Sequence, residues 1–409
     1  MNHCEKLLCL AALAVAPSMP VFGALDKLGA MGDSLTDEYW DSGVSTYASN
    51  WVSILAQFRG IDVGPTAAQA GTNSWGSPRN RGYEYNWALS GATSAELLAE
   101  GQQTGLAAQA GSDGVSNAVL DIGANDFNAA STAYQAIYFG EWSSAEIKSY
   151  VNQTVSNVET ALAAAKGAGI SIVLGNVIDP GITPVVDEYF PNPASRQLVT
   201  KAIQSVNEGL KNLAQKYQAP LMDWYGLEVA VFGSNTSLRS TILVGNVAMN
   251  LRGIDPGPPR WAPTNAFVSD GFHPNTVVQE LLANLVLQAF DSSHNDNVAL
   301  FSEREILSQA SIPYGGTDTL QSAIGPYSNY IVLPAAPKFT GIRVTGTNVV
   351  LDFSTVSNQL YIIEDRDDLL AGSWSTLTNN IAGTGGVVIA SDSPPANLSQ
   401  RFYRVRQLP

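Results

Sequence analysis

Cysteine and histidine are scarce in this sequence. Its 409 residues include two cysteines, Cys4 and Cys9, and three histidines. Both cysteines lie in an N-terminal leader that we expect to be removed, so the mature chain would hold no disulfide and no thiol nucleophile. His3 would leave with the same leader. The two remaining histidines, His273 and His294, are too few for a histidine-rich metal centre, and we expect neither a metal ion nor another cofactor.

Charged side chains are also few, and positive ones are the fewest. Asp, Glu, Lys and Arg make up 14% of the residues, and 21 Lys and Arg against 36 Asp and Glu give a net charge of −15. A chain this acidic, with no basic run, is repelled by phosphate backbones and anionic lipid, which excludes nucleic acid as a partner. No stretch after the leader is apolar for long enough to form a transmembrane segment.

The first 24 residues have the features of an export signal. Lys6 gives a weakly positive start, residues 7–16 are apolar, and Gly23 and Ala24 offer small side chains for cleavage. About ten apolar residues fall well short of the roughly 20 that a membrane-spanning helix needs. Glu5 weakens the positive start, which keeps a buried first helix open as the alternative. We predict a signal peptide at residues 1–24 and a secreted or periplasmic bacterial protein.

Strand-like and helix-like segments alternate between residues 26 and 290. Strands are predicted at 27–31, 117–122, 170–177 and 220–224, and helices at 47–58, 151–166, 193–217 and 275–290. Capping-box patterns occur at 143–146 and 302–305. Strands that alternate with long helices favour a parallel sheet covered on both faces, which is an α/β fold.

The pattern changes near residue 334, where helix-length periods end. Short β-rich runs separated by turn residues follow at 339–344, 349–353, 360–364, 374–377, 387–390 and 402–405. They predict a small all-β, sandwich-like module, which loosely resembles C-terminal β-modules of secreted bacterial proteins. We therefore divide the chain into the signal peptide, residues 1–24, a main domain, residues 25–333, and the β-module, residues 334–409.

The β-module could contact a polysaccharide or the cell surface. Its acidic run at 364–368 suggests a cation site, although such a run is more typical of a solvated turn. A spacer or stabilising role for the module is the alternative.

A serine follows the first predicted strand directly. In the run 32–36, Gly-Asp-Ser-Leu-Thr, Ser34 lies at the carboxyl end of that strand. Open parallel sheets place their ligands at this edge, so the Ser34 hydroxyl could face a substrate. A turn serine or a helix N-cap is an equally good interpretation of this run alone.

The run 270–274, Asp-Gly-Phe-His-Pro, supplies a base for such a serine. Imidazole can take the serine proton, and a carboxylate on its other nitrogen fixes the tautomer and stabilises the cation. Asp270 lies three positions before His273 and can reach it within one turn of chain. The competitor, His294, lies in a polar run at 291–296 that is typical of a solvated loop. The sequence therefore favours His273 as the base and Asp270 as its partner.

Two further runs could stabilise an oxyanion. Gly91, in the run 86–94, has a backbone N–H that a substrate can approach closely, and Asn125, in the run 123–126, offers a side-chain amide. Each is, taken singly, more typical of a turn at the start of a helix. Asp37 and Asp126 follow two of these runs, and we interpret both as carboxylates that stabilise turns.

Together the four runs resemble the SGNH (GDSL) hydrolase family. Ser34 stands in its first block, Gly91 in its second, Asn125 in its third, and Asp270 and His273 in its last. The resemblance implies a three-layer α/β/α fold and a catalytic triad of Ser34, Asp270 and His273. It also implies an oxyanion hole made by the Ser34 and Gly91 N–H groups and the Asn125 amide. The rival α/β-hydrolase fold is disfavoured because the sequence contains no Gly-x-Ser-x-Gly run.

This resemblance covers about residues 26–290 and not the β-module. It implies an esterase that works through an acyl-serine intermediate, on short-chain or carbohydrate O-acetyl esters. A lipase or lysophospholipase, and a non-catalytic surface-binding protein on the same scaffold, are the alternatives. Aromatic residues near the blocks could stack on sugars or line an acyl pocket, although ordinary packing is favoured for most of them. They are Tyr39, Trp40, Trp75, Tyr83, Tyr85, Trp87, Tyr134, Tyr138, Phe139 and Trp142.

Overall fold

The structure is a computed structural model that describes residues 25–39, 43–294, 297–356, 359–369, 373–396, 398 and 400–408. The predicted signal peptide lies outside the described residues, as do Cys4, Cys9 and His3. Contacts divide the described chain into a larger unit, residues 25–334, and a smaller unit from residue 335 onward.

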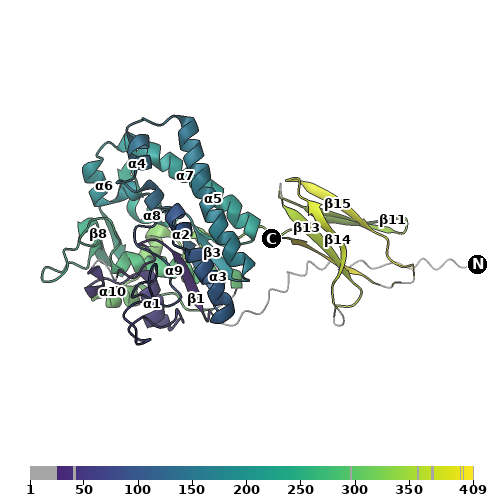
Figure 1. Cartoon of the computed structure of the whole chain (residues 1–409), viewed down its shortest axis with the longest axis horizontal. Coiled ribbons are helices and arrows are strands. Elements are labelled where there is room, and N and C mark those ends of the chain that lie inside the picture. The colour runs from purple at the N-terminus through teal and green to yellow at the C-terminus, as the bar shows by residue number, and fades with distance from the viewer. Residues whose placement is uncertain are drawn as a thin grey trace, which may run out of the picture. The chain divides into compact units, whose positions relative to one another are not determined.

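A five-stranded sheet forms the centre of the larger unit (Figure 1). Its strands are β1 (Leu28–Gly32), β2 (Asn117–Asp121), β3 (Ser171–Gly175), β4 (Leu221–Met222) and β10 (Ile331–Val332), in that order. The first four run parallel, and β10 pairs antiparallel with β4 at the edge. The predicted parallel sheet is confirmed. The predicted strand at 220–224 is too long, because Trp224 begins a helix.

Side chains of the central strands alternate between two hydrophobic cores. On β2, Val119 packs into one core, whereas Ala118 and Leu120 pack into the other. On β3, Val173 and Ile172 divide in the same way. This alternation follows from the two-residue period of a strand, and it requires apolar cover on both faces of the sheet.

Helices provide this cover and complete a three-layer α/β/α fold, as predicted. One core includes residues of α1 (Trp51–Arg59), α8 (Trp224–Phe232), α9 (Thr276–His294) and α10 (Glu303–Gln309). The other includes residues of α2 (Ser94–Ala99), α3 (Gln102–Ser112), α4 (Thr132–Tyr138), α5 (Ser144–Gly167) and α7 (Pro193–Tyr217). Both predicted capping boxes are present, at the N-termini of α5 and α10. The polar run at 291–296 is not a loop throughout, since 291–294 belong to α9.

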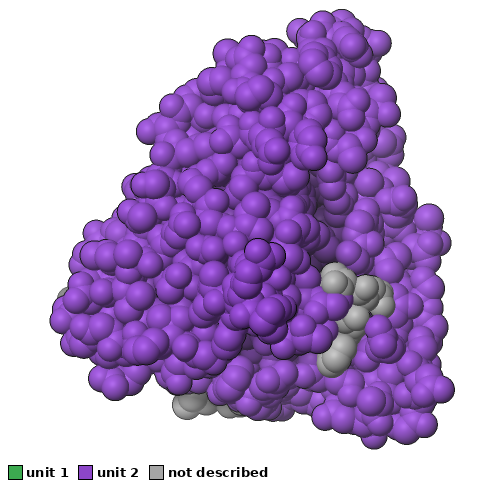
Figure 2. Space-filling model, turned by 90° about the vertical axis from the view of Figure 1, so that its left-hand side faces the viewer, with its two compact units in different colours: residues 1–21, 335–409 green, residues 22–334 purple. Residues whose placement is uncertain are grey.

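Several elements of the larger unit were not predicted. They are α8, α6 (Pro184–Tyr189), α11 (Leu320–Ile324), the hairpin β5 (Gly233–Ser234) and β6 (Ser237–Leu238), and a sheet of β7 (Thr241–Val244), β8 (Val247–Ile254) and β9 (Asn265–Phe267). Short 3₁₀ turns complete the unit at η1 (Val44–Thr46), η2 (Asn125–Phe127), η3 (Pro180–Ile182) and η4 (Tyr327–Tyr330). Figure 2 shows one face of this unit, with a furrow in its surface. Within the described part of the chain, no helix is long and apolar enough to cross a membrane.

The smaller unit contains two antiparallel sheets of three strands each, β11–β12–β15 and β14–β13–β16. Its strands are β11 (Phe339–Thr345), β12 (Asn348–Ser354), β13 (Leu360–Arg366), β14 (Ser375–Ala382), β15 (Val387–Asp392) and β16 (Phe402–Gln407). Leu351 and Phe353 of one sheet share a core with Tyr361 and Ile363 of the other. The predicted sandwich-like module is therefore confirmed, strand by strand.

The acidic run of this unit begins on strand β13, and only Asp367 and Asp368 lie exposed after the strand, as expected for a solvated turn. Glu364 lies on β13, is 6% exposed, and accepts hydrogen bonds from the Nε atoms of Arg404 (2.7 Å) and Arg406 (2.8 Å). The hydrogen bond with Arg406 is the main cause that lowers the pKa of Glu364 to about 2. Asp367 pairs with Arg401. The carboxylates of this run therefore hold neighbouring strands together.

We predict that replacing Glu280 with Met stabilises the protein at alkaline pH. Glu280 of α9 is fully buried, and neither carboxylate oxygen has a hydrogen-bond partner within the described residues. Burial raises its pKa from 4.5 to about 9, so the stability it contributes is complete below pH 4.5 and is lost as the pH rises through 9. Urea unfolding should show a gain of about 3 kcal/mol at pH 8.5 and a much smaller gain at pH 5. Equal gains at both pH values would contradict a neutral buried carboxyl.

Candidate active site

The carboxyl ends of β1 and β2 bring two predicted site residues together. The strands pair in register, with Gly32 opposite Asp121. Ser34 follows β1 by two positions, and Asn125 begins η2 shortly after β2. Parallel strands end at the same edge of a sheet, so both side chains line one pocket.

His273 reaches this edge from a tight turn before α9. The Val268 N–H donates to the His273 carbonyl, and the Gly271 N–H donates to the Val268 carbonyl, both at 2.9 Å. Gly271 has a φ of 67°, a left-handed conformation that glycine adopts without the strain of a β-carbon. The turn therefore fixes the His273 backbone, although the chain between Ser34 and His273 is long.

Ser34, His273 and Asp270 form a continuous chain of hydrogen bonds. His273 Nε2 lies 2.7 Å from Ser34 Oγ, and His273 Nδ1 lies 2.6 Å from Asp270 Oδ2. Asp270 Oδ1 accepts the N–H groups of Phe272 at 2.8 Å and of His273 at 2.9 Å. The carboxylate is thus held by its own turn, with one oxygen left to orient the imidazole.

Asp270 is ionised at neutral pH. Partial burial raises the pKa of this carboxyl, but the hydrogen bond and charge of His273 and the two backbone N–H groups outweigh burial. The net effect holds the pKa of Asp270 below its ordinary value of 3.8. An ionised Asp270 can keep the proton of neutral His273 on Nδ1, which leaves Nε2 to accept the Ser34 proton.

Two aromatic rings confine the imidazole of His273. The ring of Phe272 lies edge-on with its centroid 5.2 Å away, and the ring of Tyr39 does so at 6.0 Å. The Tyr39 hydroxyl donates to the Pro274 carbonyl at 2.9 Å and accepts from Gln279 Nε2 at 2.6 Å. Tyr39 therefore supports the site from the side of α9.

Apart from Tyr39, the described aromatic residues named from the sequence do not line the two pockets beside Ser34. Tyr83, Tyr85, Tyr134 and Tyr138 are buried in the cores, as ordinary packing requires. Trp40 lies outside the described residues.

The proposed oxyanion donors border the serine. Asn125 Nδ2 donates to the Ala92 carbonyl at 3.2 Å, and Asn125 Oδ1 accepts from Asn128 Nδ2 at 3.1 Å, so the amide is oriented. Gly91 has a φ of 83°, and a β-carbon at this position would meet no atom within 4 Å. Ser90 lines a small pocket together with Ser34. The second and third blocks thus flank the Ser34 hydroxyl.

Buried carboxyls behind the serine were missed by the sequence analysis. Asp33 is 1% exposed, and its Oδ1 accepts the Leu35 N–H at 3.0 Å. Burial raises its pKa to about 7. Asp121 is buried too, and burial followed by the charge of Asp33 raises its pKa well above 3.8. The only sequence signal for this pair is position, since Asp33 directly follows β1 and Asp121 is the last residue of β2.

Asp37 and Asp126 connect the blocks to their surroundings. Asp126 is 4% exposed and accepts three hydrogen bonds, from the Ser94 N–H (2.8 Å), the Ser94 hydroxyl (2.7 Å) and the Thr154 hydroxyl (3.3 Å). Asp37 Oδ2 accepts the Ser90 N–H at 2.9 Å. Within the described residues, no group of three or more His, Cys, Asp or Glu side chains is arranged to hold a metal ion.

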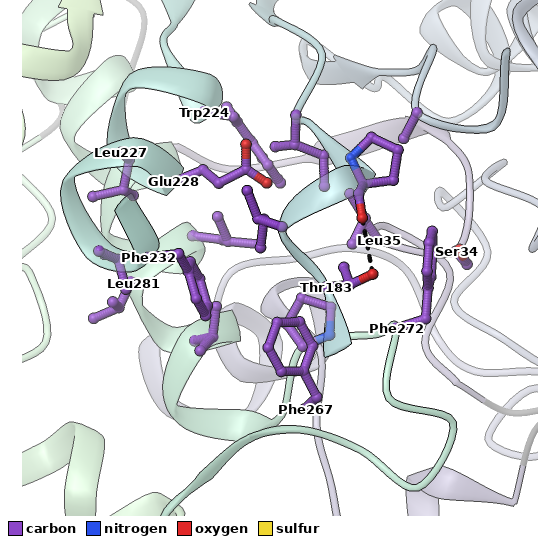
Figure 3. A pocket seen from close by; sticks show the side chains of 18 of the residues that line it. Ser34, Leu35, Thr183, Trp224, Leu227, Glu228, Phe232, Phe267, Phe272 and Leu281 are labelled. Atoms are coloured by element: carbon purple, nitrogen blue, oxygen red, sulfur yellow. Dashed lines mark hydrogen bonds between the residues drawn. The ribbon is translucent and has the colours of Figure 1, made fainter. Parts of the chain in front are cut away.

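An apolar pocket extends from Ser34 into the layer of helices (Figure 3). It encloses about 730 Å³ of empty space, including the part open to solvent. Leu35 and Phe272 line it near the serine, and side chains of α8 and α9 line it deeper in the unit. A smaller pocket of about 310 Å³ also borders Ser34, and its lining combines polar residues such as Asp37 and His273 with Val44 and Val268.

A serine hydrogen-bonded to a histidine that is held by an aspartate, at the carboxyl edge of a parallel sheet, is the arrangement of a serine hydrolase. The family model described as GDSL-like lipase/acylhydrolase matches residues 28–286. This match covers more than half of the chain, so the chain belongs to the GDSL-like lipase/acylhydrolase (SGNH) family.

Solved structures of esterases and lipases are similar in fold. The esterase EstA of Pseudoalteromonas sp., inhibited by monoethylphosphonate, is 14% identical at a TM-score of 0.35, covering 66% of this chain and 99% of that chain. An acetyl xylan esterase of Geobacillus stearothermophilus is 15% identical at 0.35, covering 68% and 98%. A lipase from a goat rumen metagenome is 16% identical at 0.38, covering 64% and 97%. Likenesses of this size do not bear on substrate. No curated protein matches the chain.

We predict that Asp126→Ala lowers stability more than it lowers any turnover. The change leaves the buried N–H and hydroxyl of Ser94 without their acceptor, which costs about 3 kcal/mol. Asp37→Ala is the matched control, because Asp37 is less buried and its loss should cost about 1 kcal/mol. Thermal unfolding and kcat would be measured for both variants. An Asp126→Ala protein that keeps its Tm and loses turnover would contradict a structural role for this carboxylate.

Proposed function

We propose that this protein hydrolyses carboxylic acyl esters through an acyl-Ser34 intermediate. The observation that carries the proposal is the hydrogen-bond chain from Ser34 Oγ through His273 to Asp270. In the first step Ser34 Oγ attacks the ester carbonyl carbon while His273 Nε2 takes its proton. The carbonyl oxygen becomes an oxyanion that the N–H groups of Ser34 and Gly91 and the Asn125 amide stabilise.

Acylation is completed when His273 gives its proton away, and deacylation then repeats the sequence with water as the nucleophile. The tetrahedral intermediate collapses, the bond to the alcohol breaks, and His273 gives its proton to the leaving oxygen. Water then loses a proton to His273 and attacks the acyl carbon, and Ser34 Oγ leaves with the proton that His273 returns. Asp270 stays ionised throughout and stabilises the imidazolium. The net reaction is ester and water to acid and alcohol.

The apolar pocket supports an apolar acyl group longer than acetyl. Its largely apolar walls would desolvate a hydrocarbon chain attached at Ser34. The smaller pocket beside His273 suits the alcohol, because His273 must protonate the leaving oxygen. We therefore favour the lipase-type alternative over the short-chain or carbohydrate O-acetyl esters that the sequence analysis favoured. Export by the predicted leader and a polysaccharide or surface contact of the β-module remain predictions.

We predict that Ser34→Ala abolishes turnover of p-nitrophenyl esters. Loss of a triad nucleophile should reduce kcat by about 10⁴-fold or more, and Asn125→Ala should reduce it by about 10²–10³-fold. The assay compares both variants with wild type at equal concentration, with circular dichroism as the check on folding. A folded Ser34→Ala variant that retains wild-type turnover would overturn the proposed mechanism.

We also predict a preference for medium over short acyl chains. Each buried methylene contributes about 0.8 kcal/mol, so kcat/KM should rise at least about tenfold from p-nitrophenyl acetate to octanoate. Val278, which lines the pocket from α9, provides the test. Val278→Phe should lower the octanoate rate about tenfold and leave the acetate rate nearly unchanged. If acetate is the better substrate of the wild type, the pocket does not hold the acyl chain.

A further inference from the structure

Glu228 is a carboxylic acid in the apolar wall of the pocket that adjoins Ser34. It lies on α8 beside Leu227, another lining residue, and is 8% exposed. Figure 3 shows its carboxyl group directed from α8 toward the middle of the lining side chains, with Ser34 drawn at the opposite side of the pocket. An acid in such a wall is costly unless its oxygens are paired, so each oxygen has to be accounted for.

The two oxygens of Glu228 differ in their surroundings. Oε2 accepts the Asp179 N–H at 2.8 Å. Within the described part of the chain only Oε2 has a hydrogen-bond partner, and Oε1 is not among the fully buried unpartnered atoms, so it is open to the pocket although the residue is only 8% exposed. The structural task of Glu228, which is to bind the Asp179 N–H, therefore uses half of its carboxyl group.

Burial favours the uncharged form of Glu228. Burial raises its pKa well above 4.5, and the nearby Asp179 adds to this shift. Asp179 itself accepts hydrogen bonds from the Thr200 hydroxyl (2.6 Å), the Asn235 amide (2.8 Å) and the Gly181 N–H (2.8 Å). Asp179 is thus surrounded by donors, whereas Glu228 has one oxygen without a protein partner, and in the neutral acid this oxygen can donate to an oxygen of a ligand.

We propose that Glu228 is a specificity residue that hydrogen-bonds an oxygen function on the acyl chain of the substrate. The preferred substrates are then esters of hydroxylated or otherwise oxygenated medium-chain acids, rather than of plain fatty acids. This inference rests on the proposed function, in which the acyl chain enters the pocket from Ser34. A site with a buried polar group discriminates against an analogue that leaves the group unpaired, because nothing replaces the lost water.

Glu280 is a second buried acid of this unit, and it differs from Glu228 in its access to the pocket. It is also buried with unpartnered oxygens within the described residues, but it does not line the pocket. A ligand therefore has access to Glu228 and not to Glu280. Glu280→Gln is accordingly the matched control, a change at a buried acid of the same unit.

The test measures kcat/KM of the full chain for p-nitrophenyl octanoate and for a series of isomeric p-nitrophenyl hydroxyoctanoates. Each member of the series carries one hydroxyl group, placed at one of the carbons 3 to 8. Wild type should prefer at least one isomer over octanoate by about tenfold. Glu228→Leu should remove this preference while octanoate is still hydrolysed. Glu228→Gln keeps an acceptor for the Asp179 N–H and a donor toward the pocket, so it should retain part of the preference. Glu280→Gln should retain all of it.

The outcomes separate this inference from the proposed function. Ser34-dependent octanoate hydrolysis without a preference for any isomer overturns the role of Glu228 and leaves the esterase in place. The same holds if Glu228→Leu and Glu228→Gln lower all rates equally, because a purely structural residue would do so. An absence of turnover on every ester overturns both.

Discussion

The hydrogen bond between Ser34 Oγ and His273 Nε2 joins two segments that are 239 positions apart in the chain. A contact of this separation exists only if the whole sheet and its helices are in place, since the loop between its ends has a large closure entropy. β1 delivers the serine to the carboxyl edge of the sheet. The turn before α9, closed by backbone hydrogen bonds around Gly271, delivers the histidine to the same edge.

The acids around this contact differ in pKa according to how deeply they are enclosed. Asp270 lies at the surface end of the site and stays ionised, because backbone N–H groups and His273 stabilise its charge. Asp33, behind the serine, and Glu228, in the pocket wall, are enclosed, and burial raises the pKa of both. The protein thus keeps the negative charge that the imidazolium needs, while burial shifts the enclosed acids toward their neutral form.

The site residues could be predicted because their chemistry is local in sequence. Ser34 follows a buried strand, and Asp270 lies one turn of chain from His273, so each run carries its own signal. The two faces of the sheet could also be predicted, since strands such as β2 have a short apolar centre and are buried at every position. The sandwich strands followed from alternation and turn residues.

The pocket wall could not be predicted for physical reasons. Residues 224–232 are apolar nearly throughout, and a short apolar run has no period that separates a helix from a strand. The preceding strand was therefore predicted to continue to Trp224, and α8 was not predicted. The sequence carries no local signal for the burial of Glu228 and Glu280, because their burial depends on tertiary packing of α8 and α9. The acidic run on β13 was misinterpreted because its arginine partners lie about 40 residues later, as in the Glu364–Arg404 pair.

Covalent trapping of the nucleophile tests the central claim most directly. The folded protein would be treated with a reactive organophosphonate ester and digested, and the modified peptide would be sequenced by mass spectrometry. We predict a single adduct on Ser34 Oγ, formed at a rate that falls sharply in a folded His273→Ala variant. An unmodified Ser34 in the folded wild-type protein, or labelling that does not depend on His273, would contradict a nucleophile activated by the His273–Asp270 pair.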